Sequence, residues 1–474
     1  MRGVVSSNRR TIAHYSDEPT ALEFAGSEWA PRLSGLGTSC PDHFLRTRIC
    51  PLFVEWDPAT RDVDALKKAI RSQSVSYRAD YEKYYHSCAT PDSPALRDSN
   101  PSVVLIPGVG LFGFGKSKKE ARITTEFFIN AVNVMSGATA LEDSTQSSAT
   151  VLPQARRADQ SAAFEQFHNY VALPRSEAFR IEYWALEEAK LQRMPPEAEF
   201  SRKIILIVGG GSGIGREVAL LLARKGAHIV IADADLASAS RVAAEAGALG
   251  SPDAAVSVQV DLGSADSLKQ AAEFTILAFG GLDGVVNTAA IYPVAGADGR
   301  LNESQWSKTF LVNVTGNYLL AQQTEAIFRD QQLPSSIVLT GSANAVVPKK
   351  GSEAYDTSKS AINHLVRELA IGLAPQVRVN GIAPATVVAG STMFPRDRVM
   401  QSLQKYSIAY SESESTEALR DKLADFYAQR TLTRRPILPQ DCANAIVWLL
   451  SDQSAKTTGH IIPVDGGLPE AFLR

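Results

Sequence analysis

The chain has 474 residues, of which 45% are hydrophobic and 21% charged, and its formal net charge at pH 7 is −3. This length is too great for one hydrophobic core, so we expect a globular protein of two or three domains. The charge argues against a nucleic-acid or membrane partner, and no apolar run approaches the ~20 residues that cross a bilayer. The four cysteines form no Cys-x-x-Cys pair, and the start lacks a secretory signal, which favours a cytoplasmic protein.

Two loose stretches interrupt the first 200 residues. Residues 136–161 are small and polar with little apolar period, so we expect a long mobile loop. Residues 192–203 carry two prolines and several charges after a helix-like segment at 176–191, so we expect a linker. These stretches predict an N-terminal domain over residues 1–195 and a second domain over residues 201–474.

After residue 203, short apolar runs alternate with segments of helical period. The first run is continuously apolar, as expected for a strand that is buried on both faces of a sheet. Alternating strands and helices at this spacing predict an α/β fold with a doubly wound parallel sheet of the Rossmann type. The predicted strands lie within residues 203–210, 228–235, 254–261, 282–290, 335–342, 376–384 and 460–467.

The first predicted strand leads into a glycine-rich turn at the start of a predicted helix. Without a Cβ, the backbone can turn sharply and approach a pyrophosphate, while the helix N-terminus offers unpaired N–H groups. The alternative is a glycine-rich turn that binds no ligand. The glycines are Gly209, Gly210, Gly211, Gly213 and Gly215.

The second predicted strand ends at Asp233, eighteen residues after Gly215. A carboxylate at this place can accept hydrogen bonds from both ribose hydroxyls of an adenosine and repels a 2′-phosphate. The next residue, Ala234, offers no positive charge for such a phosphate, so the sequence favours NAD over NADP. Asp235 takes this role instead if the strand ends two residues later.

The glycine spacing and the pair Tyr355-x-x-x-Lys359 together resemble the short-chain dehydrogenase/reductase family over residues 203–474. The resemblance implies that Ser342, Tyr355 and Lys359 are catalytic and that Asn313 holds a water molecule that links Lys359 to solvent. The alternatives are that Ser342 caps the strand end and that Asn313 satisfies buried backbone. The family pattern places NAD against Gly209, Gly211, Ser212, Gly213, Ile214, Gly215, Asp233, Asp261, Leu262, Asn287, Ala289, Tyr355, Lys359, Pro384 and Val387.

The chain departs mildly from this family pattern. Val208 stands where a threonine is usual, and Ala290 and Ala385 stand where glycines are usual. These changes concern the local backbone geometry and leave the chemical groups in place.

Tyrosine is a poor base at neutral pH because its ordinary pKa is about 10. An ammonium group one helical turn away, on Lys359, and the positive nicotinamide ring are expected to lower the pKa of Tyr355. Tyr355 then exchanges a proton with the substrate oxygen, and Ser342 donates a hydrogen bond to the same oxygen. We therefore expect an NAD-dependent oxidoreductase acting on a secondary alcohol or carbonyl of a small hydroxy compound, such as a sugar, a sugar acid or lactaldehyde.

A long insertion follows the sixth predicted strand, from about Gly390 to Arg435. Its apolar and charged residues recur at helical period. In the family this region lies over the substrate, so we expect a lid. The alternatives are a dimer contact or a solvated pair of helices.

The first 200 residues resemble the latter part of a class II aldolase domain, in 37–48, 103–138 and 176–191. Fusions of the two families are the bifunctional rhamnulose-1-phosphate aldolase/alcohol dehydrogenases. Such aldolases use a metal ion held by a His-x-His pair and a further histidine, but this chain has no His-x-His. We therefore expect a truncated remnant without a metal site; the residual candidate ligands are His43, His14 and His86.

Two other functions compete with the dehydrogenase hypothesis. One is a metal-dependent aldolase activity of the rhamnulose-1-phosphate type in the first 200 residues, and the other is a non-catalytic NAD-binding protein. A metal site would be required for the first, and an obstructed cleft for the second.

The sequence also predicts a homodimer or homotetramer. In short-chain dehydrogenases, two long helices commonly pair with their copies, and here these helices are predicted at 303–330 and 355–374. The alternative is that both helices are covered by their own chain. Their apolar residues exceed what one face against a sheet requires, and include Leu319, Leu320, Ile362, Leu365, Leu369 and Leu373.

Overall fold

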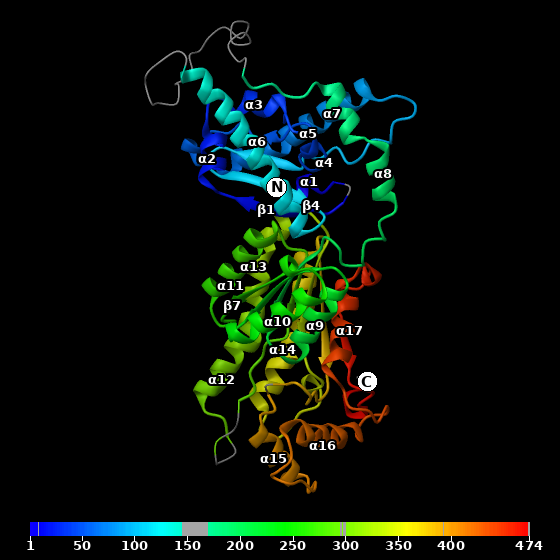
Figure 1. Cartoon of the computed structure of the whole chain (residues 1–474). Helices are drawn as coiled ribbons and strands as arrows, with labels where there is room; N and C mark the ends of the chain where they lie inside the picture. The colour runs from blue at the N-terminus through cyan, green and yellow to red at the C-terminus, as the bar shows by residue number, and fades with distance from the viewer. Residues whose placement is uncertain (8, 145–168, 294–295, 297–299, 392, 473–474) are drawn as a thin grey trace. The chain divides into compact units, whose positions relative to one another are not determined.

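The computed structural model describes residues 1–474 except 8, 145–168, 294–295, 297–299, 392 and 473–474. The chain forms two units, whose residues can be followed along the colour bar of Figure 1. The first comprises Met1–Glu197 with Leu277–Gly280, and the second comprises Ala198–Ile276 with Gly281–Arg474. No helix in the described part of the chain is both long and apolar enough to cross a membrane.

The first unit is a mixed α/β structure around a four-stranded sheet in the order β1-β4-β3-β2. β4 pairs antiparallel with β1 and β3, whereas β2 pairs parallel with β3. Separate apolar clusters contain Leu105 and Val104, neighbours in β3 whose side chains alternate between the sheet's faces. The strands are β1 (Ile12–Ser16), β2 (Leu52–Phe53), β3 (Val103–Ile106) and β4 (Gly110–Gly115); the helices are α1 (Arg2–Val5), α2 (Pro19–Gly26), α3 (Ala30–Leu36), α4 (Phe44–Thr47), α5 (Val63–Cys88), α6 (Lys118–Ser144), α7 (Arg175–Glu182) and α8 (Ala185–Gln192).

The expected mobile loop at 136–161 is partly wrong, because residues 136–144 continue helix α6. Met135 and Thr139 are buried one helical turn apart, and the Thr139 hydroxyl donates to the Met135 carbonyl oxygen at 2.9 Å. Packing thus extends the helix through small residues that show little apolar period. The remainder of the expected loop lies outside the described residues.

The second unit contains a seven-stranded parallel sheet in the order β11-β10-β9-β8-β5-β6-β7. The doubly wound parallel sheet predicted from the sequence is confirmed. The order reverses beside β5, and ligands of such sheets bind at the carboxyl ends of the strands near this reversal. The strands are β5 (Ile204–Val208), β6 (His228–Asp233), β7 (Ala255–Gln259), β8 (Gly284–Asn287), β9 (Ser335–Thr340), β10 (Val377–Pro384) and β11 (Ile461–Val464).

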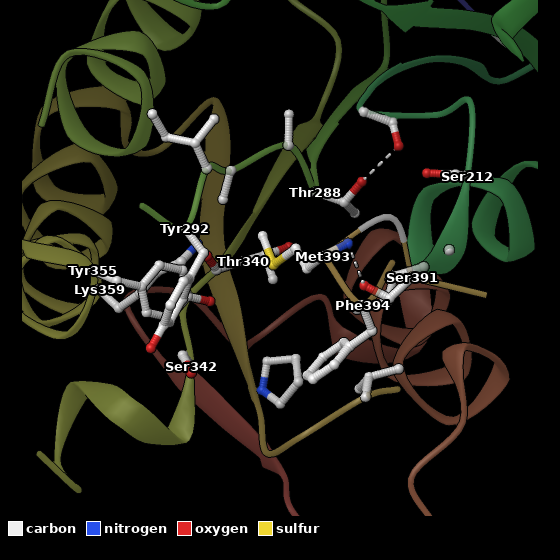
Figure 2. Close-up of a pocket in the computed structure, with 18 of the residues that line it drawn as sticks. Ser212, Thr288, Tyr292, Thr340, Ser342, Tyr355, Lys359, Ser391, Met393 and Phe394 are labelled. Atoms are coloured by element: carbon white, nitrogen blue, oxygen red, sulfur yellow. Dashed lines mark hydrogen bonds between the residues drawn. The ribbon is translucent and has the colours of Figure 1, made fainter. Parts of the chain in front are cut away.

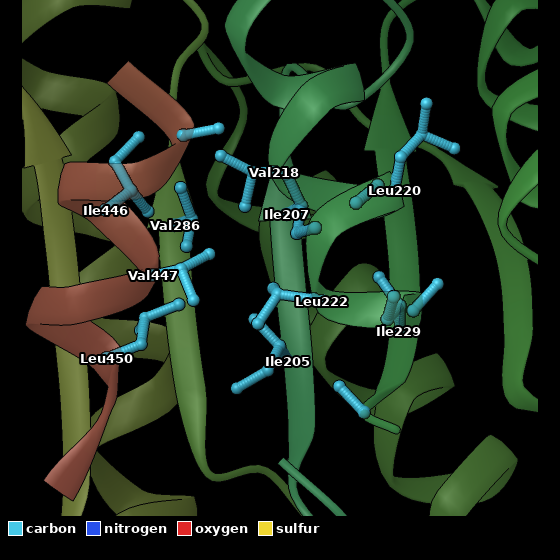
Figure 3. Close-up of a cluster of buried hydrophobic side chains, with 14 of the residues drawn as sticks. Ile205, Ile207, Val218, Leu220, Leu222, Ile229, Val286, Ile446, Val447 and Leu450 are labelled. Carbon is cyan, nitrogen blue, oxygen red and sulfur yellow. The ribbon is translucent and has the colours of Figure 1, made fainter. Parts of the chain in front are cut away.

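Helices cover this sheet through apolar side chains. Ile205 and Ile207 of β5 pack with Val218 and Leu222 of α9 and with α17 in one cluster (Figure 3). Leu206 is fully buried outside this cluster, because successive side chains of a strand point to opposite faces. The helices are α9 (Gly213–Arg224), α10 (Leu236–Leu249), α11 (Ala265–Phe279), α12 (Glu303–Phe310), α13 (Gly316–Gln331), α14 (Glu353–Leu373), α15 (Arg396–Lys405), α16 (Thr416–Ala428) and α17 (Pro439–Leu450).

Candidate active site

A cavity of about 660 Å³ opens where strands of the second unit end. Its wall includes the last residues of β5, β6, β9 and β10, as expected for a ligand site in a doubly wound sheet. Most residues predicted for the site line this cavity, whereas Gly215, Asn287 and Asn313 do not. Those lining it are Gly209, Gly211, Ser212, Gly213, Ile214, Asp233, Asp261, Leu262, Ala289, Ser342, Tyr355, Lys359, Pro384 and Val387.

The glycine turn has a backbone that other residues would adopt only with strain. Gly209 and Gly213 have φ angles of 78° and 51°, in the left-handed region that favours glycine. A Cβ on Gly209 would lie 2.6 Å from the main-chain nitrogen of Ala289. Helix α9 begins at Gly213, and its N-cap residue, Ser212, makes no side-chain capping hydrogen bond. The first N–H groups of the helix are therefore available to an anionic ligand.

Gly215 supports the turn from behind the cavity wall. A Cβ at this position would overlap the carbonyl oxygen of Gly209 and would lie 2.7 Å from Thr288 Oγ1. The Thr288 hydroxyl in turn donates to the Gly209 carbonyl at 3.0 Å. The glycine therefore allows helix α9 to start directly against the turn.

Asp233 lies at the carboxyl end of β6 and contacts the glycine turn. Its Oδ2 accepts a hydrogen bond from Gly211 N at 2.9 Å, and its Oδ1 accepts one from Asp235 N at 3.0 Å. Asp235 is the N-cap of α10 and accepts hydrogen bonds from Ala237 N and from the Ser238 hydroxyl. These bonds lower the pKa of Asp235, that from the Ser238 hydroxyl most strongly. The fold therefore uses Asp235 to begin a helix.

Two further predicted residues have structural partners. Asp261 lines the cavity after β7, and its Oδ1 accepts from Gly263 N at 2.8 Å. Asn287, at the end of β8, donates to Asn317 Oδ1 at 2.7 Å and accepts from Ala289 N at 2.9 Å. Asn287 thus holds the loop that forms the cavity wall.

Ser342, Tyr355 and Lys359 come together beside the end of β9 (Figure 2). Tyr355 and Lys359 lie one turn apart in α14, and the Ser342 hydroxyl hydrogen-bonds to the Tyr355 phenol. The Lys359 ammonium donates to the Thr340 carbonyl at 2.7 Å and lies 5.5 Å from the centroid of the Tyr355 ring. The Ser342 hydroxyl also accepts from Asn344 N at 3.1 Å, so the serine both caps a short turn and reaches the tyrosine.

Burial is the main influence on the pKa values of Tyr355 and Lys359. It raises the pKa of Tyr355 to about 12, and the hydrogen bond to Ser342 opposes this rise. It lowers the pKa of Lys359 to about 8. Removing water from the phenolate therefore outweighs the neighbouring protein groups that favour it. The expected fall in the pKa of Tyr355 also depends on the nicotinamide ring and stays a prediction.

Asn313 lies within a π-helical turn, Leu311–Thr315, between α12 and α13. Its side chain accepts from Ile291 N at 2.8 Å and donates to Ile291 O at 3.0 Å and to Ser358 Oγ at 3.1 Å. These contacts correspond to the structural alternative, in which Asn313 satisfies buried backbone. They fix the loop after β8 beside α14.

Sequence reasoning missed an aromatic and basic part of the cavity wall. The Tyr292 ring lies 4.9 Å from the Tyr355 ring, and Lys349, Arg398 and Tyr427 also line the cavity. Arg398 shares one helix face with Ser402 and Lys405, at positions i, i+4 and i+7, and this spacing was the available signal. Tyr292 has no comparable signal, because it follows a strand as a single aromatic residue.

The insertion at 390–435 contains α15 and α16, which have an apolar core of their own. Val399 and Leu403 of α15 are fully buried against Leu419 and Leu423 of α16. Residues of this segment also form part of the cavity wall, which agrees with its expected position over the substrate. They are Ser391, Met393, Phe394, Arg398, Ser402, Lys405, Tyr406 and Tyr427.

His43 of the first unit, a residual candidate ligand, has a packed environment. It is buried, its Nδ1 lies 3.2 Å from Thr38 Oγ1, and its ring stacks on Phe127. Burial lowers its pKa. Among the described residues, no group of three or more histidines, cysteines or carboxylates is arranged to hold a metal ion.

Known families match both parts of the chain. Residues 203–398 match the short chain dehydrogenase model, and residues 406–469 match the model described as Enoyl-(Acyl carrier protein) reductase. The short chain dehydrogenase/reductase astE of Aspergillus oryzae is 32% identical over 272 residues, which cover 56% of this chain and 94% of that protein. The chain belongs to the short-chain dehydrogenase/reductase family. Members of this family are oxidoreductases that generally bind a nicotinamide cofactor.

This short-chain dehydrogenase carries a second recognisable part. Residues 1–191 match the second domain of class II aldolases, so the predicted fusion is confirmed. An uncharacterized oxidoreductase of Bacillus subtilis, YuxG, is 33% identical over 475 residues and spans all of this chain. The chain spans only 63% of the length of that relative.

A solved structure agrees with the fold of the dehydrogenase unit. Sorbitol-6-phosphate 2-dehydrogenase from Erwinia amylovora superposes with a TM-score of 0.51 at 21% sequence identity. The match covers 57% of this chain and all of that one. At this identity the similarity concerns the fold.

Proposed function

We propose that the second unit transfers hydride between NAD and a secondary alcohol or carbonyl of a small hydroxy compound. One observation carries the proposal: a single cavity contains both the glycine turn with Asp233 and the group Ser342, Tyr355 and Lys359. The first set is suited to a dinucleotide and the second to proton transfer at an oxygen atom. A binding protein without catalysis would not require the second set.

The residues of the cavity fit a dinucleotide. The glycine turn leaves no side chain between the backbone and the cavity, and the uncapped start of α9 supplies N–H donors for a pyrophosphate. Asp233 stands at the end of β6, where a carboxylate accepts ribose hydroxyls and disfavours a 2′-phosphate. These features support NAD as the cofactor.

In the proposed mechanism, Tyr355 exchanges a proton with the substrate oxygen. Its raised pKa keeps the phenol protonated at neutral pH, so it can donate the proton during carbonyl reduction. NAD supplies the hydride acceptor for the reverse reaction, and its positive ring favours the phenolate. Ser342 orients the phenol and donates to the developing oxyanion. Lys359, held by the Thr340 carbonyl, places a positive charge beside the phenol.

Replacing Tyr355 by Phe tests this mechanism. The variant keeps the ring packed against Tyr292 and removes the proton donor, so kcat should fall by about 10²- to 10⁴-fold. A screen of hydroxy acids, polyols and sugars with NAD first identifies a substrate. Calorimetric titration should then show that Tyr355→Phe binds NAD as tightly as the parent does. Both proteins should bind NAD at least tenfold more tightly than NADP.

The control for this experiment is Tyr410→Phe, because Tyr410 is partly exposed and does not line the cavity. It should keep full turnover. Undiminished turnover in Tyr355→Phe would contradict the mechanism. NAD binding without turnover of any probe would instead support the non-catalytic alternative.

We also propose that the chain forms a homodimer or homotetramer through α12, α13 and α14. Of the six apolar residues named for this contact, Leu320, Ile362 and Leu373 are buried within the chain. Exposed apolar side chains nevertheless remain on α12, α13, α14 and the π-helical turn between α12 and α13. These side chains support the proposed contact with a second copy of the chain. They are Trp306, Leu311, Tyr318 and Ile371.

A cytoplasmic location is the last part of the proposal. The four cysteines are free, as is usual in a reducing compartment. Localisation of a tagged chain in its host would test it.

A further inference from the structure

Charged side chains are distributed unevenly along the cavity wall. Among the described residues, the carboxylates that line it are Asp233 at the end of β6, Asp235 just after β6, and Asp261 just after β7. The loop before α14 and the helix α15 contribute no carboxylate to the cavity. They contribute four positive side chains, from Lys349, Lys350, Arg398 and Lys405.

Arg398 brings this positive charge close to the catalytic group. Its guanidinium lies 4.3 Å from the centroid of the Tyr292 ring, which itself lies beside Tyr355 (Figure 2). Its Nη1 donates to the Met393 carbonyl at 2.9 Å, which fixes the side chain. The Tyr292 ring therefore contacts both the Arg398 guanidinium and the Tyr355 ring.

Lys349 contributes a second cation. Its amino group lies 6.0 Å from the Tyr427 ring and forms no hydrogen bond or ion pair with any described residue. The neighbouring Asp356 carboxylate is already engaged, since it accepts from Lys349 N at 2.8 Å, Asn344 Nδ2 at 2.7 Å and Ser352 Oγ at 2.8 Å. The half-buried ammonium thus faces the cavity with its donors free.

Burial and the neighbouring positive side chains both lower the pKa of Lys349. Burial lowers the pKa of Lys349, and the charges of Arg430, Lys405 and Arg398 lower it further, whereas Asp356 opposes them. Like charges gathered in a partly dry cavity repel each other, so an anion between them would relieve the repulsion. Clustered positive groups of this kind are typical of a site that binds an anion.

Helix α15 presents a complementary surface for that ligand. Arg398, Ser402 and Lys405 follow one another on one face and line the cavity, with Lys405 at the exposed rim. Neither Arg398 nor Lys405 forms an ion pair within the described chain. Asp397 lines an adjoining hollow and is exposed to solvent.

We propose that the alcohol substrate carries an anionic group, a phosphate or a carboxylate, which binds between Lys349, Arg398 and Lys405. This inference rests on the proposed hydride transfer, because it places the reacting carbon of the same molecule at Tyr355. Charge-assisted hydrogen bonds to ammonium and guanidinium groups are among the strongest that proteins form. A neutral alcohol would offer these three cations no ion pair.

The experiment compares two matched sets of probes in turnover and in binding. The first set is sorbitol, D-gluconate and sorbitol 6-phosphate; the second is glycerol, D-glycerate and glycerol 3-phosphate. Calorimetry with NADH present measures binding independently of hydride transfer. The variants are Lys349→Met and Lys405→Met, and the control is Lys269→Met, a 62% exposed lysine on α11 that does not line the cavity.

In at least one set, an anionic member should exceed its neutral counterpart in kcat/KM by about tenfold or more, and should bind more tightly. Each cavity variant should reduce this preference by about tenfold, whereas Lys269→Met should keep it. The preferred member distinguishes phosphate from carboxylate. Equal binding of neutral and anionic probes, no binding of any anion, or an unchanged preference in both cavity variants would overturn the inference. Lysine-dependent anion binding without turnover would support the anion site and contradict the hydride-transfer function.

Discussion

Replacing Gly215 by Ala should damage the glycine turn, although the added methyl group lies outside the cavity. The new Cβ would overlap the Gly209 carbonyl oxygen and would lie 2.7 Å from Thr288 Oγ1. The overlapping atom is backbone of the turn itself and cannot rotate away as a flexible side chain could. Overpacking of this kind typically costs about 1–3 kcal/mol.

The assay is hydrogen exchange measured on peptides from β5 and α9, combined with calorimetric titration of NAD. A loss of 1–3 kcal/mol corresponds to protection that is reduced by between about fivefold and about 150-fold. NAD affinity should fall at least about tenfold, because α9 must move away from the turn that its N-terminus completes.

Gly372→Ala is the matched control. Gly372 lies in the last turn of α14, and nothing lies within 4 Å of an added Cβ there. This change should leave NAD binding unaltered and stabilise the helix by up to about 1 kcal/mol. If Gly215→Ala matched this control in both protection and NAD affinity, the close contact inferred for the turn would be refuted.

Two further predictions concern pH and assembly. Burial lowers the pKa of Lys359 from 10.5 to about 8, so the folded state binds this proton less tightly than the unfolded state does. Charged Lys359 therefore destabilises the fold below about pH 8, and the penalty disappears as the pH rises towards 10.5. Lys359→Met should accordingly be more stable than the parent at pH 7, by up to about 3 kcal/mol, with a difference that shrinks by pH 10. Urea unfolding at several pH values checks this, and a difference independent of pH would contradict it. Light scattering at micromolar concentration should give the mass of a dimer or tetramer, and a monomer mass would refute the proposed assembly.

The strands and the glycine turn could be predicted because their signals are local. A parallel strand buried on both faces must be apolar throughout, as in Ile204–Val208, where every residue is buried. The positive φ angles of Gly209 and Gly213 likewise require glycine at fixed places in the sequence. Each signal lies within a few residues of the feature that it predicts.

The remaining features depend on tertiary packing. The helix through residues 136–144 forms despite small, polar residues because its buried face packs in the first unit. The raised pKa of Tyr355 follows from how much water the folded chain removes from its phenol. One cavity is lined by three residues from separate segments of the chain, Tyr292, Lys349 and Arg398. No spacing in the sequence therefore indicates that they lie together.

The separate apolar core of α15 and α16 has an evolutionary consequence. Val399 and Leu403 anchor α15 to α16, whereas Arg398, Ser402 and Lys405 on a neighbouring face line the cavity. Substitutions at the cavity-facing positions therefore leave the anchoring contacts of the helix intact and do not touch the parallel sheet. Ligand preference can therefore change through substitutions on one face of α15 while the sheet and the glycine turn stay unchanged.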